Sequence, residues 1–134
     1  MRVVVGMDLV SVERMRESVE TFGDRFLQRV FTREEIAHCE TFSGDAVFER
    51  MASRFAAKEA AIKLLRPEGR FFDPRLIEVT RAEGGATDIR LHGEALSLAE
   101  RQQIESLSLS MSHEGHMAAA IVVGVVNQDD RSHS

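Results

Sequence analysis

The stretch from Arg54 to Lys63 constrains the fold most, because it reads as the middle of a buried helix and yet carries several charges. Residues 46–65 contain no glycine or proline, and their large apolar residues fall on one stripe at about 100° per residue. Burying a charge is costly unless it is paired or binds a ligand. The charged side chains therefore predict a site: Arg54, Lys58, Glu59 and Lys63. An ordinary surface helix, with ion pairs one turn apart such as Glu59–Lys63, is the alternative.

The hydrophobic pattern predicts one α+β domain over residues 1–126, followed by a polar tail at 127–134. The order is a strand, several helices and then a mostly antiparallel sheet, against which the long helix packs. A capping box at Thr32 and Glu35 opens one of the shorter helices. The expected strands span residues 2–8, 76–81, 87–91, 107–112 and 116–126, and the expected helices span 9–22, 24–30, 32–41, 46–65 and 94–102.

Composition excludes several classes of function. The net charge of −5 over 134 residues argues against nucleic-acid binding, which favours a basic surface. Cys39 is the only cysteine, so neither an intrachain disulfide nor a cysteine-based zinc site is expected. The chain shows neither a signal peptide nor a run of about 20 apolar residues. We therefore expect a cytoplasmic protein that does not interact with membranes.

A second carboxylate, Asp8, follows the apolar run at the start of the chain. Position alone leaves two interpretations open: Asp8 or Ser11 caps the next helix, or Asp8 binds a metal ion. Magnesium typically takes one or two protein carboxylates and completes its shell with waters and phosphates. Asp8 and Glu59 would suit such an ion, and Arg54, Lys58 and Lys63 would suit its phosphates.

A third candidate region, Ser110 to His116, lies between the last two strands. The simplest interpretation is an exposed turn. The alternative is that His113 binds a phosphate or acts as an acid or base, because the pKa of histidine lies near neutrality.

These three regions resemble the signatures of the holo-acyl-carrier-protein synthase family, the small trimeric class of 4′-phosphopantetheinyl transferases. The opening signature is met by residues 6–14, Gly-Met-Asp-Leu-Val-Ser-Val-Glu-Arg. The helix signature is met at every fixed position of residues 54–63, and the late signature by residues 110–114. The resemblance covers essentially the whole chain and implies a 4′-phosphopantetheinyl transferase fold.

The resemblance also implies a reaction. A serine of an apo acyl carrier protein would attack the β-phosphorus of coenzyme A, take the 4′-phosphopantetheine arm and release adenosine 3′,5′-bisphosphate. The resemblance implies that Mg²⁺ is held by Asp8 and Glu59. A water on the metal, Glu59 and His113 all remain candidates for the general base. A non-catalytic module that binds coenzyme A or a nucleotide is the alternative.

The remaining implied roles concern binding. Coenzyme A phosphates would be contacted by Arg54, Lys58, Lys63 and His113, with both lysines stabilising the leaving phosphate. Arg14 would dock an acidic face of the carrier protein, and the molecule would be a homotrimer with sites between subunits. Two departures from the family pattern stand out: Glu114 replaces an aspartate, and residues 65–70 replace a glycine-rich turn.

Overall fold

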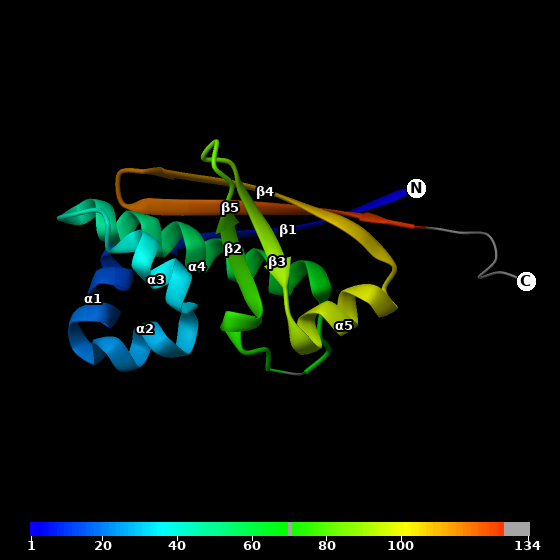
Figure 1. Cartoon of the computed structure of the whole chain (residues 1–134), viewed down its shortest axis with the longest axis horizontal. Coiled ribbons are helices and arrows are strands. Elements are labelled where there is room, and N and C mark those ends of the chain that lie inside the picture. The colour runs from blue at the N-terminus through cyan, green and yellow to red at the C-terminus, as the bar shows by residue number, and fades with distance from the viewer. Residues whose placement is uncertain (70, 128–134) are drawn as a thin grey trace, which may run out of the picture.

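The computed structural model describes residues 1–69 and 71–127 and has the expected α+β architecture. One layer is a three-stranded sheet, and helices pack against one of its faces (Figure 1). The strands are β1 (Arg2–Ser11), β2 (Ile77–Arg81), β3 (Thr87–Leu91), β4 (Ile104–Glu114) and β5 (Met117–Val126). The helices are α1 (Val12–Phe22), α2 (Asp24–Val30), α3 (Arg33–Cys39), α4 (Asp45–Leu65), the 3-10 turn η1 (Pro74–Leu76) and α5 (Gly93–Arg101).

The sheet is antiparallel, with strand order β1-β5-β4. Alternation along β1 sends Val4, Gly6 and Asp8 to the face that α4 covers. Gly6 is buried, and a Cβ atom placed there would lie only 1.9 Å from the Ala60 carbonyl oxygen. The absence of a side chain at Gly6, together with the alanines of α4, therefore allows the helix to lie directly on the strand.

The other face of the sheet has no helix over it (Figure 1). Along β1 this face presents Val3, Val5, Met7 and Leu9, each more than half exposed. Ile121, which pairs with Met7, continues the apolar surface onto β5. Among the described residues, this is a large uncovered apolar surface, of the kind that marks an interaction site.

The remaining elements surround α4. Helices α1 to α3 gather around its N-terminal half, while the separate β2–β3 hairpin and α5 lie toward its other end (Figure 1). Buried side chains form one cluster between α4 and the sheet and a second cluster among α1, α2, α3 and α4. Within the described residues, no helix is both long and apolar enough to cross a bilayer.

Two of the boundaries that differ from the prediction bear on the candidate site. Strand β1 runs on to Ser11, whose hydroxyl caps α1 by accepting from the Arg14 amide at 3.2 Å. Asp8 therefore lies within the strand and caps no helix. Strand β4 runs to Glu114, so His113 belongs to a strand and the turn begins only at Gly115. Apart from Asn127, the predicted polar tail lies outside the described residues.

Candidate active site

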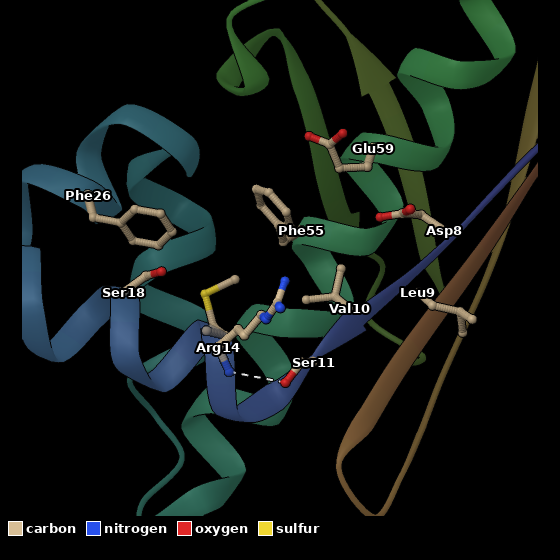
Figure 2. Close-up of a pocket in the computed structure, with 10 residues that line it drawn as sticks. Asp8, Leu9, Val10, Ser11, Arg14, Ser18, Phe26, Phe55 and Glu59 are labelled. Atoms are coloured by element: carbon tan, nitrogen blue, oxygen red, sulfur yellow. Dashed lines mark hydrogen bonds between the residues drawn. The ribbon is translucent and has the colours of Figure 1, made fainter.

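Asp8 and Glu59 line one pocket of about 350 Å³, at the place where β1 crosses α4. Figure 2 shows both carboxylates opening onto this pocket, whereas the Leu9 side chain points to the opposite side of the strand. Asp8 lies two residues after Gly6, and Glu59 lies one residue before Ala60. The close approach of Gly6 and Ala60 therefore brings together the strand and helix positions that carry the two carboxylates.

The two acids of this pocket interact with each other and with Lys63. Partial burial and the neighbouring Asp8 carboxylate both raise the pKa of Glu59, and Lys63 offsets part of that increase. The Lys63 ammonium lies 2.8 Å from Asp8 Oδ1 and also donates to the Met7 carbonyl at 3.0 Å. The Lys63 side chain remains 56% exposed, so the ammonium is also accessible to a ligand in the pocket.

An apolar wall and one arginine complete the pocket. Phe26 of α2 and Phe55 of α4 line it together with Ser18 and Arg14 of α1. In Figure 2 the Arg14 side chain extends from α1 toward Phe55. Because Arg14 is exposed, it is also accessible to a protein that approaches along α1.

A second pocket, also of about 350 Å³, is basic and contains His113. His113 Nε2 lies 2.8 Å from an Arg50 nitrogen, and its Nδ1 lies 3.8 Å from a Glu49 carboxylate oxygen. Because arginine can only donate, Nε2 acts as the acceptor in this pair. Arg54 and Arg81 also line the pocket, which gives it three guanidinium groups and suits it to phosphate.

The structure contradicts one predicted ligand contact. Lys58 is fully buried, and its ammonium lies 2.8 Å from Glu35 Oε1. It also donates to the carbonyls of Pro74 at 3.0 Å and Ile77 at 2.6 Å. An ammonium has three donors, and all three have protein partners, so Lys58 is not available to a coenzyme A phosphate. The alternative of a surface helix is also wrong, since Arg54 is only 2% exposed.

The other predicted residues form two separate groups. Asp8, Glu59 and Arg14 line the first pocket with Lys63 beside them, whereas Arg54 and His113 line the second. Glu114 points to the uncovered face of the sheet, because it follows His113 in strand β4. The sequence reasoning missed Arg50 and Arg81, which stand outside the three signatures and reach the basic pocket only through the tertiary fold.

Comparison with known proteins identifies the family. The sequence profile of the 4′-phosphopantetheinyl transferase superfamily matches residues 4–122. The chain belongs to this superfamily. The fold is therefore that of a 4′-phosphopantetheinyl transferase, in agreement with the resemblance of the three signatures.

Relatives within the superfamily match over nearly their full length. A holo-[acyl-carrier-protein] synthase from Leptospira biflexa is 39% identical over 120 residues, which span 89% of this chain and 93% of that protein. The structure of a coenzyme A complex from Chronobacterium ammoniagenes superposes with a TM-score of 0.80 at 30% identity, covering 96% and 100% of the two chains. The structure of the synthase from Neisseria meningitidis superposes with a TM-score of 0.76 at 33% identity, covering 91% of this chain and 97% of that one.

The donor set of the first pocket fits a magnesium ion. Two carboxylates open onto one space, and the like charge of Asp8 raises the pKa of Glu59, a repulsion that a divalent cation would remove. In residues 1–69 and 71–127, no three His, Cys, Asp or Glu side chains gather into a closed metal site. Magnesium does not need such a site, since waters and substrate phosphates complete its shell.

Proposed function

We propose that this chain transfers the 4′-phosphopantetheine arm of coenzyme A to a serine of an apo acyl carrier protein, with Mg²⁺ held by Asp8 and Glu59. The observation that carries the proposal is the first pocket, which both carboxylates line and beside which the Lys63 ammonium pairs with Asp8. The names of the relatives support the same reaction, as does the coenzyme A bound in the related structure from Chronobacterium ammoniagenes.

The protein contributes position and charge to this reaction. When bound, the metal ion would neutralise the charge that builds up on the pyrophosphate oxygens. Lys63 stands beside Asp8 with more than half of its side chain exposed, so it can stabilise the leaving phosphate. Of the two side chains proposed as general base, Glu59 is favoured because it lines this pocket. His113 lines the other pocket, and Arg50 occupies its Nε2 lone pair.

The basic pocket is the proposed site for the remaining phosphates of coenzyme A. Arg54 and His113 retain the roles that the resemblance implies, and Arg50 and Arg81 join them. Lys58 is removed from the set, because its donors are satisfied inside the protein.

We further propose that the enzyme is a homotrimer. A single chain carries two separate half-sites. One is the first pocket, lined by Asp8 and Glu59 (the acidic pocket), and the other is the basic pocket that contains His113. The apolar outer face of β1 supplies a surface that needs a cover, and a second copy of the same chain would cover it.

Docking of the carrier protein is assigned to α1. Arg14 is exposed at the rim of the acidic pocket, where it can pair with an acidic carrier surface. Phe26 and Phe55 form the apolar wall beside it, along which the pantetheine chain can lie. We also propose a cytoplasmic location, which agrees with the free and buried Cys39 thiol.

Intact-mass spectrometry tests the proposed function. Purified protein is incubated with coenzyme A, magnesium and apo carrier protein, and the carrier is weighed over time. We expect one phosphopantetheine increment per carrier, lost when EDTA replaces magnesium and lost with a carrier whose acceptor serine is changed to alanine. A protein that binds coenzyme A, as shown by a thermal shift, but never modifies any carrier would instead be a non-catalytic binding module.

A further inference from the structure

A buried ion pair joins three parts of the fold next to the basic pocket. Lys58 of α4 and Glu35 of α3 are 0% and 2% exposed, and the ammonium lies 2.8 Å from Glu35 Oε1. Glu35 also closes the capping box, because its Oε1 accepts from the Thr32 amide at 2.7 Å. Its Oε2 accepts from the amide of Val79 in β2, also at 2.7 Å. One carboxylate therefore contacts α3, α4 and β2 at once.

The ammonium extends the same network into the segment before β2. Its other two donors go to the carbonyls of Pro74 in η1 and Ile77, the first residue of β2. Four of these contacts, all but the capping bond within α3, thus hold the start of β2 against Lys58 of α4, directly or through Glu35. No polar side-chain atom buried in the described part of the chain lacks a partner, so the network is fully satisfied.

Two of the elements that this network joins, α4 and β2, supply cations to the basic pocket. Arg54 stands one helical turn before Lys58 on α4, and Arg81 stands two residues after Val79 on β2. Both side chains line the pocket that contains His113. A shift of β2 along α4 would change the separation of the two guanidinium groups, and so the fit of the pocket to its anion.

We propose that Lys58 and Glu35 are positioning residues, whose buried pair holds Arg81 of β2 and Arg54 of α4 at the separation that binds the coenzyme A phosphates. Stability alone does not explain such a pair, because replacing both partners by neutral residues of similar size is often neutral or stabilising. The proposal rests on the proposed function in so far as it names coenzyme A as the ligand.

Three variants distinguish a positioning role of the Lys58–Glu35 pair from a purely stabilising role. Lys58→Met and Glu35→Gln each leave one buried partner without its countercharge, so both single variants should lower Tm. The double variant leaves neither charge unpaired and should recover part of that loss, although the Pro74 and Ile77 carbonyls still lack their donor. If the pair positions the pocket, the recovered double variant still binds coenzyme A roughly tenfold more weakly by calorimetry, the loss expected when one charge-assisted hydrogen bond is strained. Its KM for carrier protein should stay unchanged.

Val126→Ala is the matched control. Val126 is buried at the C-terminal end of β5 and lies outside both the network and the basic pocket. Its truncation should therefore lower stability without changing the residues of the pocket. At equal folded fraction, the control should bind coenzyme A as the parent does. If the double variant does not fold, Glu35→Gln is compared with Val126→Ala in the same way. Parent-like binding in the folded network variant, or equal weakening in Val126→Ala, would overturn the proposal.

Repeating the titrations with inorganic phosphate, in the absence of magnesium, separates the two proposals. Inorganic phosphate probes the cations of the basic pocket whether or not the chain transfers phosphopantetheine. Weaker phosphate binding in the double variant, together with a parent that modifies no carrier, would uphold the positioning role and refute the proposed function. The reverse combination would uphold the function and refute the positioning role.

Discussion

Replacing Gly6 by alanine tests whether the close packing of β1 on α4 creates the acidic pocket. The new Cβ would lie 1.9 Å from the Ala60 carbonyl oxygen and 3.0 Å from the Leu64 amide nitrogen. Real Cβ contacts are essentially never shorter than 3.0 Å, so strand and helix must separate by about 1 Å. The obstacle is helix backbone, which cannot rotate away as a side chain would.

The displacement has a cost in stability and a larger cost in activity. Overpacking of this kind destabilises a fold by about 1–3 kcal/mol, which corresponds to a Tm drop of roughly 3–15 °C for a domain of this size. Asp8 and Glu59 stand immediately beside the contact, so they separate with it. A misplacement of about 1 Å at reacting groups can lower turnover about 100-fold.

The assay is the rate of carrier modification by intact mass, measured well below the Tm of each variant. Gly124→Ala is the control: its Cβ would meet only side chains, Val4 at 3.1 Å and Leu107 at 3.2 Å, which can adjust. We expect that variant to lose little turnover. Parent-like turnover in folded Gly6→Ala would refute the idea that this contact sets the carboxylate separation.

Three further changes probe other parts of the molecule. Arg14→Glu should raise the KM for carrier protein roughly tenfold and leave the KM for coenzyme A unchanged; an unchanged carrier KM would remove Arg14 from the docking surface. Burial raises the pKa of the Cys39 thiol from 9.0 to about 11, so the unfolded chain ionises first. The free energy of unfolding is thus unaffected by the thiol below pH 9 and falls as pH rises toward 11, by up to about 2–3 kcal/mol relative to Cys39→Ala. The same difference in urea midpoint between parent and Cys39→Ala at pH 7 and at pH 10.5 would contradict this. Val5→Asp places a charge on the exposed face of β1 and should reduce a trimer to monomers in sedimentation velocity, whereas a persistent trimer would exclude that face as the interface.

Local signals in the sequence predicted most elements well. The capping box at Thr32 and Glu35 is present, and the long helix begins at Asp45, one residue before its predicted start, and ends at Leu65 as expected. The end of the first strand was harder to place, because Leu9 and Val10 suit either a strand or the first turn of a helix. The structure resolves this through Ser11, which caps α1 and leaves Asp8 in the strand.

The partners of the charged residues could not be read from local patterns. Lys58 has the same residue type and spacing as a phosphate ligand, and only the tertiary fold brings Glu35, Pro74 and Ile77 around its ammonium. Glu35 was recognised for its capping role alone, although the same carboxylate also pairs with Lys58. No local pattern marks Arg81 as a possible ligand either, because it belongs to a hairpin whose placement against α4 depends on long-range packing.

The most direct test of the central claim compares parent and Glu59→Ala in the carrier-modification assay with magnesium and coenzyme A. Because Glu59 is only partly buried and lines an open pocket, its truncation should leave the fold and Tm nearly unchanged. We expect the phosphopantetheine increment on carrier treated with the parent, and a rate lowered at least about 100-fold with the variant. Modification by folded Glu59→Ala at the parent rate would contradict it.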